Sequence, residues 1–181
     1  VGAAIEQITG QPAEPAIAEQ VFQPLGLASA GWGAPPEPSP WGHRNLFGQL
    51  IPMDPASPGA DNPLALGPAG TAHMRLSDYG RWLRVFLGGG PEGYVSDENL
   101  ARLTRPWPDA TSTYALGWGV APRAAWAGTG PGLVHEGSNT MWRCAALVAP
   151  ARGLAAAVIA NRDTDDCAPL AARLIEMAGQ V

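Results

Sequence analysis

Two apolar segments near the end of the chain, separated by a short polar break, constrain its fold more than any other feature. Residues 142–149 and 154–160 are largely apolar, and Pro150-Ala151-Arg152-Gly153 between them is typical of a tight turn. The pattern predicts two adjacent antiparallel strands. The second run lacks polar alternation, which predicts a strand buried on both faces and helices that cover the sheet.

Further elements are expected around this pair of strands. Residues 133–135 predict a neighbouring strand that ends at Gly137, at an edge where the backbone can approach a ligand. Residues 114–120 predict another strand. A final helix is expected from about Asp166, and its core stripe is expected to comprise Leu170, Leu174 and Met177, with Ala171, Ile175 and Ala178 beside them.

The first half of the chain predicts helices and loops. A helix should run from residue 1 to a stop at Gly10, and a second from residue 14 to 22. Residues 31–68 are rich in proline and glycine and predict a long loop that is either functional or packed by its own aromatic side chains. Within it, His43 is expected to be structural, with a hydrogen bond to backbone. Two more helices are expected, one capped by Ser77-Asp78 and running through Leu87, and one from Ser96 to Leu103.

Composition excludes several classes of function. The 181 residues fit one domain or a large part of one, and 46% hydrophobic content is ample for a core. A net charge of −5 without a basic cluster argues against nucleic-acid binding, and no apolar run approaches the ~20 residues of a membrane span. All 11 basic residues are arginines, so no lysine of this chain can act as a base. The 2 cysteines, Cys144 and Cys167, do not fix the redox compartment.

The tripeptide His135-Glu136-Gly137 is the candidate for chemistry. It can be a strand-borne proton carrier beside a glycine, followed by a backbone N–H that faces a developing oxyanion. Taken alone, however, the tripeptide favours a partly buried histidine before a turn glycine. A zinc-protease motif would need a second histidine where Asn139 stands. A self-contained pair of Ser138 and His135 is disfavoured, because residues three apart on a strand point in diverging directions and no orienting acid is evident.

Several stretches, in their order along the chain, resemble the C-terminal part of the penicillin-recognising serine hydrolases, in the branch of class C β-lactamases and D-aminopeptidases or esterases. The resemblance covers nearly the whole chain. It is carried by residues 5–12, 21–27, Gly67-Pro68-Ala69-Gly70 with the Ser77-Asp78 helix, residues 114–118, His135-Glu136-Gly137-Ser138 and residues 154–161.

The resemblance implies roles for individual residues. In the family, a serine and a lysine share an S-x-x-K motif, a tyrosine and an asparagine form a second motif, and K-T-G or H-x-G on a strand forms the third. This chain contains only the third. His135 takes the Lys/His position that supports the proton relay, and the N–H of Ser138 takes the place of an oxyanion-hole donor. Glu136, Gly137 and Gly70 would contact substrate.

Two departures from the family pattern concern substrate charge. Glu136 stands where a small hydroxyl residue is usual. After the last strand, where class C β-lactamases are polar or basic, this chain carries Asp163, Asp165 and Asp166. Acids in that segment disfavour a substrate carboxylate nearby. The same three acids can also be a solvated loop and a helix cap.

The expected fold is α+β: an antiparallel sheet flanked by helices, with a helical and loop segment, of the β-lactamase/transpeptidase type. Residues 1–181 would be the C-terminal part of one catalytic domain, with 9–113 mainly helix and loop and 114–181 strands and the final helix. The expected function is hydrolysis of an ester, amide or β-lactam through an acyl-enzyme, with serine and lysine on a missing N-terminal segment.

The alternative is a non-catalytic member of the same fold that binds a peptide or a cell-wall ligand. No cofactor or metal is expected, and the expected partner is a small-molecule substrate. The resemblance slightly favours an exported protein.

Overall fold

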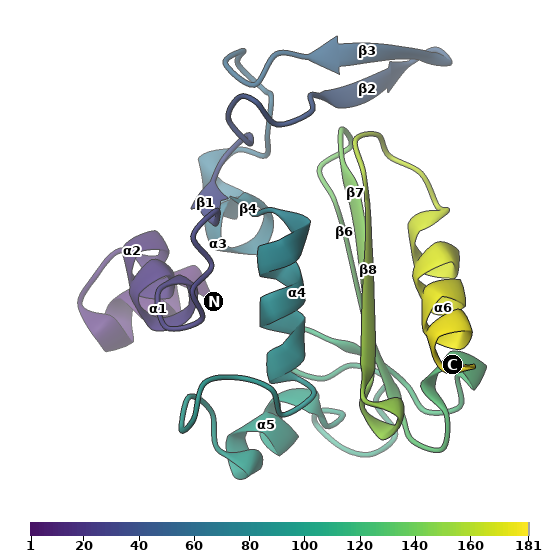
Figure 1. Cartoon of the computed structure of the whole chain (residues 1–181). Coiled ribbons are helices and arrows are strands. Elements are labelled where there is room, and N and C mark those ends of the chain that lie inside the picture. The colour runs from purple at the N-terminus through teal and green to yellow at the C-terminus, as the bar shows by residue number, and fades with distance from the viewer. Residues whose placement is uncertain (181) are drawn as a thin grey trace. The chain divides into compact units, whose positions relative to one another are not determined.

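The two predicted strands of the C-terminal hairpin, residues 142–149 and 154–160, are the last two strands of a 4-stranded sheet in the order β5-β6-β7-β8. The strands are β5 (Gly119–Ala121), β6 (Gly132–Ser138), β7 (Arg143–Ala149) and β8 (Leu154–Ala160) (Figure 1). Strand β7 is joined to β8 by a 3-10 turn at Pro150–Arg152 followed by Gly153. Gly153 adopts the left-handed conformation, with φ 65°. The predicted hairpin is confirmed.

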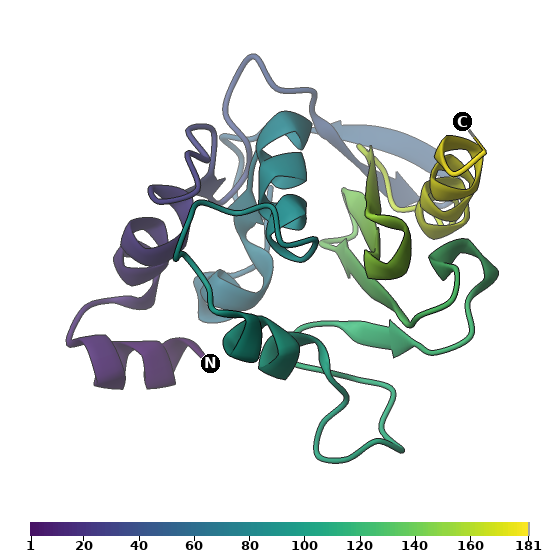
Figure 2. The same cartoon turned by 60° about the horizontal axis from the view of Figure 1, so that its bottom comes forward.

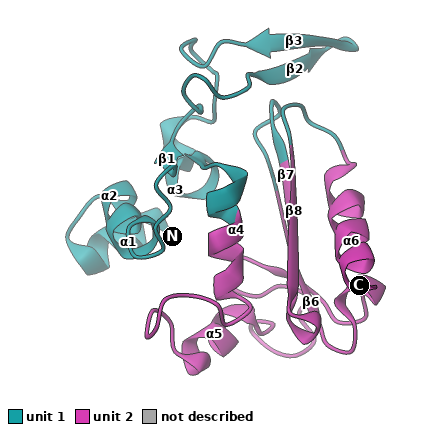
Figure 3. Cartoon of the chain, in the orientation of Figure 1, with its two compact units in different colours: residues 1–79, 137–143, 160–164 teal, residues 80–136, 144–159, 165–181 magenta. Residues whose placement is uncertain are grey.

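The structure, a computed structural model, describes residues 1–180. The chain forms two units (Figure 3): unit 1 comprises residues 1–79, 137–143 and 160–164, and unit 2 comprises residues 80–136, 144–159 and 165–181. The α+β fold with an antiparallel sheet, expected from the sequence, is confirmed.

The buried strand of the sheet is β7 and not β8, which corrects the expectation for residues 154–160. Residues Ala145 to Ala149 of β7 are all buried, whereas most of β8 is half-buried and its Ile159 is 39% exposed. The reason is position, because β7 lies inside the sheet and β8 at its edge. An apolar run without alternation indicates burial but does not tell a central strand from an edge strand.

The C-terminal helix α6 (Cys167–Ala178) covers one face of the sheet (Figures 1 and 2). Its buried residues are Cys167, Ala171 and Ile175, and the last two form a core cluster with Leu147 and Ala149 of β7. The predicted core positions Ala171 and Ile175 are confirmed, and Ala178 is exposed. The predicted core positions Leu170, Leu174 and Met177 are wrong, since these side chains are about half exposed. The small side chain of Ala171 lets the helix approach the sheet closely.

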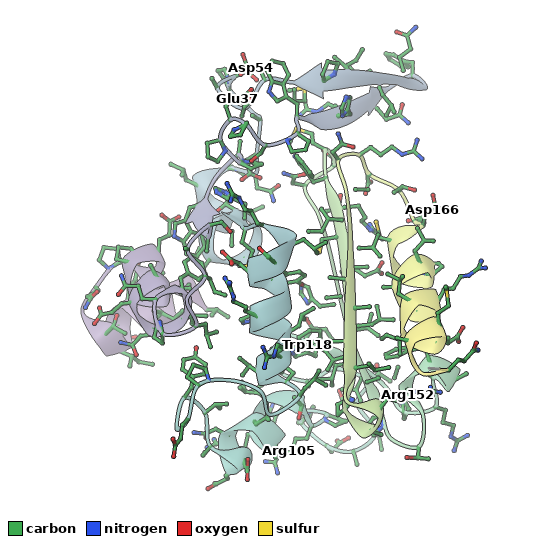
Figure 4. All side chains as sticks on the ribbon, viewed as in Figure 1. Glu37, Asp54, Arg105, Trp118, Arg152 and Asp166 are labelled. Atoms are coloured by element: carbon green, nitrogen blue, oxygen red, sulfur yellow. The ribbon has the colours of Figure 1, made fainter. Side chains whose placement is uncertain are left out.

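An aromatic cluster packs around Trp118 in unit 2. The rings of Trp82 and Trp118 stack at a centroid distance of 5.6 Å, and Phe86 lies edge-on to both at 4.9 Å. Trp118 is 2% exposed and lies beside helix α4 (Leu76–Val85) (Figure 4). The rings of this cluster bury a large apolar area and hold the turn before β5.

Unit 1 contains the N-terminal helices and two small sheets. Gly10 ends the first helix in the left-handed conformation, as predicted. The helices are α1 (Gly2–Thr9), α2 (Ala13–Ile17) with its π-helical extension η1 (Ala18–Phe22), the 3-10 helix η2 (Leu64–Leu66) and α3 (Gly67–Gly70). The antiparallel pairs are β1 (Gly31–Trp32) with β4 (Ala72–His73), and β2 (Gly42–Leu46) with β3 (Gln49–Met53).

The hairpin β2–β3 lies in the stretch expected to be a loop. Its turn uses Phe47 at φ 52° and Gly48 at φ 87°, the paired positive values that suit the twist of a two-residue hairpin. Phe47 stands where a two-residue hairpin turn usually has asparagine or aspartate, and Pro52 within β3 argues against a strand. The sequence therefore did not predict this hairpin.

Three element boundaries also differ from expectation. Helix α4 begins at Leu76, and Asp78 does not precede it but accepts hydrogen bonds from the N–H and Oγ of Ser29 at 2.8 and 2.6 Å. Residues 115–118 form a turn between Tyr114 and Gly119, which pair in an antiparallel bridge, and Gly117 adopts φ 91° within this turn. Strand β6 continues through Gly137 to Ser138.

The remaining helices lie in unit 2. Helix α5 (Asp97–Thr104) begins as predicted, with the Oγ of its N-cap Ser96 accepting from the N–H of Asn99 at 3.2 Å. A 3-10 helix, η3 (Ala125–Ala127), precedes β6.

Gly132 is the tightest glycine of unit 2, and replacing it tests the packing of the sheet. A Cβ there would overlap Cη2 of Trp126, a ring that packs against the core cluster. Gly132→Ala is therefore expected to lower the free energy of unfolding by about 1–3 kcal/mol. Gly80→Ala in helix α4 is the matched control, because a Cβ meets nothing within 4 Å there, and it should stabilise the protein by up to about 1 kcal/mol. Thermal or denaturant unfolding of both variants measures the difference, and equal stabilities would contradict this packing.

Candidate active site

The motif His135-Glu136-Gly137-Ser138 occupies the last four residues of β6. Strand β5 pairs with residues 132–134 of β6, through Gly119↔Val134 and Ala121↔Gly132, so the motif extends past the end of β5. All four residues are exposed. Side chains alternate along a strand, so His135 lies on one face of β6 and Glu136 and Ser138 on the other.

His135 is fixed by a backbone hydrogen bond within unit 2. Its Nδ1 lies 2.8 Å from the carbonyl oxygen of Gly117, and its ring stands edge-on to Trp118 at a centroid distance of 6.1 Å. A carbonyl oxygen can only accept, so Nδ1 carries the hydrogen. The Nε2 of the neutral ring is then left as an acceptor on an exposed side chain, which suits proton transfer.

Ser138 is part of a polar cluster in unit 1. Its hydroxyl donates to Oδ1 of Asp163 at 2.8 Å and accepts from the N–H of Thr140 at 2.9 Å. Nη1 of Arg143 lies 3.6 Å from the same carboxylate oxygen. Because the hydroxyl hydrogen is directed at a carboxylate, Ser138 is not arranged as a nucleophile activated by His135. Its main-chain N–H remains the group of interest.

A chain of side-chain hydrogen bonds holds the turn after Ser138. Oδ1 of Asn139 accepts from the N–H groups of Met141 and Trp142 at 3.1 and 2.9 Å, and its Nδ2 donates to Oδ1 of Asp61 at 2.8 Å. Beside Asp61, Nδ2 of Asn62 donates to the carbonyl oxygen of Gly70 at 2.9 Å. This places the segment of Gly70 and the end of the motif in one network of unit 1. That Gly70, Glu136 and Gly137 contact substrate stays a prediction.

Sequence reasoning missed Asp61, Asn139 and the placement of Asp163 beside Ser138. Asn139 directly follows the motif, so an asparagine able to cap a turn was a usable signal. The partner Asp61 lies 78 positions earlier in the chain and carries no local signal.

The other two histidines are structural. Nδ1 of His43 bonds the carbonyl oxygen of Asn161 at 3.0 Å, and Nδ1 of His73 bonds that of Gly33 at 2.8 Å. The prediction of a backbone-bonded His43 is confirmed.

Two further observations concern ligands and membranes. A shallow pocket of unit 1, bordered by Trp41, Met53 and Trp142, includes none of the predicted site residues. Among residues 1–180, no helix combines the length and the apolar character needed to cross a membrane.

Several solved structures share this fold. An octameric penicillin-binding protein homologue from Pyrococcus abyssi is 19% identical, with a TM-score of 0.74, and the match covers 98% of this chain and 40% of that one. A D-stereospecific amidohydrolase from Streptomyces sp. is 21% identical, with a TM-score of 0.71 and coverage of 99% and 52%. A class C beta-lactamase from Rhodobacter sphaeroides is 17% identical, with a TM-score of 0.66 and coverage of 98% and 56%.

These identities establish the fold alone, and the chain spans between 40% and 56% of the lengths of these proteins. Comparison with curated protein sequences gave no match. The Beta-lactamase family model, in contrast, matches residues 1–180. The resemblance inferred from the motifs is thereby confirmed, and the chain belongs to the beta-lactamase family.

Proposed function

We propose that this chain supplies the third motif of a serine hydrolase that works through an acyl-enzyme on an ester, amide or β-lactam. His135 acts in proton transfer through Nε2, and the N–H of Ser138 donates to the oxyanion of the tetrahedral intermediate. The observation that carries the proposal is the fixed orientation of His135, whose Nδ1 lies 2.8 Å from the carbonyl oxygen of Gly117. His135 and Ser138 lie on the same strand, β6.

The nucleophile and its lysine base lie, in this proposal, on polypeptide outside the 181 residues. The chain contains no lysine and therefore no S-x-x-K motif. Ser138 is a poor substitute, because its hydroxyl is directed at Asp163 and its side chain lies on the opposite face of β6 from His135. The residues available here can position a substrate and stabilise charge but cannot form the acyl ester.

The 181-residue chain by itself is accordingly expected to form no covalent adduct with a fluorophosphonate or a penicillin. The full-length protein should be labelled stoichiometrically under the same conditions, at a serine outside this segment. Intact-mass spectrometry followed by peptide mapping measures both. A label on Ser138 or any other serine of the isolated chain would contradict the assignment. A full-length protein that carries the fold but takes no label would favour the non-catalytic alternative, a member that binds a peptide or cell-wall ligand.

A further inference from the structure

We infer that Asn139 and Asp61 are positioning residues for the oxyanion donor. They act on the backbone N–H of Ser138 by fixing the turn that follows it. The inference rests on the proposed function and adds to it two residues that touch neither substrate nor the reacting atoms.

The carboxamide of Asn139 closes the turn from within. Its Oδ1 accepts from two successive backbone N–H groups, those of Met141 and Trp142, at 3.1 and 2.9 Å. The turn needs such support, because Thr140 adopts φ 70°, which is unfavourable for a β-branched residue. With Oδ1 committed to the turn, Nδ2 must face the other way.

Asp61 fixes that other side. Its Oδ1 accepts from Nδ2 of Asn139 at 2.8 Å and from the N–H of Asn62 at 2.8 Å. Both sides of the Asn139 carboxamide are therefore fixed. The N–H donors of the turn require an oxygen on one side, and the carboxylate of Asp61 requires the NH₂ group on the other. A charge-assisted bond of this kind is stronger than a neutral one.

The turn is anchored at both ends, so its conformation affects the position of Ser138. Met141 is 2% exposed, and its carbonyl oxygen accepts from the N–H of His43 at 3.1 Å, so the far end of the turn is fixed in unit 1. At the near end, the N–H of Thr140 is bonded to the hydroxyl of Ser138. Loosening Asn139 between these points moves the peptide that carries the Ser138 N–H.

Small movements of that peptide group are expected to lower the catalytic rate but to change the affinity for the substrate little. An oxyanion donor works only at about 2.7–3.1 Å from the developing charge, and a shift of about 1 Å can lower a rate by about 100-fold. Loss of this contact affects the transition state selectively, because the ground-state carbonyl carries less charge.

The test exchanges the side chains of Asn139 and Asp61 in the full-length enzyme, first by the single substitution Asn139→Asp and then by adding Asp61→Asn. Asn139→Asp keeps the acceptor for the turn but sets a carboxylate against Asp61, so kcat for a nitrophenyl ester should fall roughly 10- to 100-fold while KM changes less than about threefold. The affinity for a boronic acid, which forms a tetrahedral adduct with the serine, should fall in step with kcat. Adding Asp61→Asn restores a donor–acceptor pair and should recover at least about fivefold of the lost kcat.

Asn45→Asp is the matched control. Oδ1 of Asn45 accepts from the N–H of Gly48 at 2.9 Å in the turn of the β2–β3 hairpin, so it has a similar local role without a link to Ser138. Its kcat should stay within about twofold of the wild type. Equal kcat losses for Asn45→Asp and Asn139→Asp, no recovery in the double variant, or unchanged boronic acid affinity would each overturn the inference while the wild type remains active. A wild type without ester turnover or serine labelling would instead overturn the proposed function, and the inference with it.

Discussion

Replacing His135 with asparagine in the full-length enzyme is expected to lower kcat by roughly 100-fold or more, the usual contribution of a positioned proton carrier. The asparagine Nδ2 occupies nearly the place of the imidazole Nδ1 and can donate to the carbonyl oxygen of Gly117, which His135 bonds at 2.8 Å. The variant therefore removes Nε2 and keeps the local anchor. Steady-state kinetics with an ester substrate, together with thermal unfolding, separate the chemical effect from a loss of fold.

His43→Asn is the matched control for this variant. His43 also bonds a backbone carbonyl through Nδ1, that of Asn161 at 3.0 Å, and is predicted to have only a structural role. Its asparagine variant should keep kcat close to that of the wild type. If His135→Asn retained wild-type kcat as well, His135 would have no part in proton transfer, and the third motif of this protein would serve only to hold β6.

The C-terminal strands were predictable because their signals are local. The turn at Pro150–Gly153 and the two apolar runs specify a hairpin without reference to the rest of the chain. The N-cap of α5 at Ser96 was found for the same reason. The β2–β3 hairpin was missed because its turn lacks the usual residues and tertiary contacts supply the missing preference, including the bond from the N–H of His43 to the carbonyl oxygen of Met141.

Burial was less predictable than the elements themselves. Helix α6 is apolar on adjoining stripes, and hydrophobicity ranked the larger leucines above Ala171. The structure buries Ala171 at 0% exposure and Ile175 at 1%, because these two side chains pack on β7, where the small Ala171 permits a close approach of the helix. In the same way, periodicity could not show that β8 is an edge strand, which depends on sheet order.

The candidate site was predictable only as far as its motif. His135 and Ser138 were identified from their place in a strand and from the family resemblance. Their hydrogen-bond partners were not, since Gly117 lies 18 positions from His135 and Asp163 lies 25 positions from Ser138. A sequence pattern can name a functional group, but the groups that fix its tautomer or its orientation are determined by long-range packing.

Asp163 shows how the structure refines the prediction about substrate charge. This residue, one of the three acids after β8, accepts a hydrogen bond from the hydroxyl of Ser138 at 2.8 Å. Nη1 of Arg143 at 3.6 Å offsets part of its charge. Asp166 occupies the N-cap position of α6, but its side chain makes no capping hydrogen bond, so the helix-cap interpretation of this segment holds for the position alone. The residue to test is Glu136, which occupies the position of the usual small hydroxyl residue in the motif.

We expect the complete enzyme to prefer neutral or cationic acyl substrates, such as simple esters or amino-acid amides, over penicillins and cephalosporins. Two like charges about 5 Å apart repel by about 3 kcal/mol at an effective dielectric of about 20, and exposure to solvent lowers this to about 1 kcal/mol. The carboxylate of a β-lactam near Glu136 should suffer this repulsion, and a neutral ester should not.

The measurement is the ratio of kcat/KM for a short-chain nitrophenyl ester to kcat/KM for nitrocefin, a cephalosporin. The wild type should favour the ester, and Glu136→Thr should narrow the ratio by roughly five- to tenfold, because it removes the charge and restores a hydroxyl donor. Glu176→Thr, at an exposed position of α6, controls for the change in net charge and should leave the ratio unchanged. A wild type that hydrolyses nitrocefin more efficiently than the ester, or a Glu136→Thr ratio equal to that of Glu176→Thr, would show that charge at this position does not select the substrate.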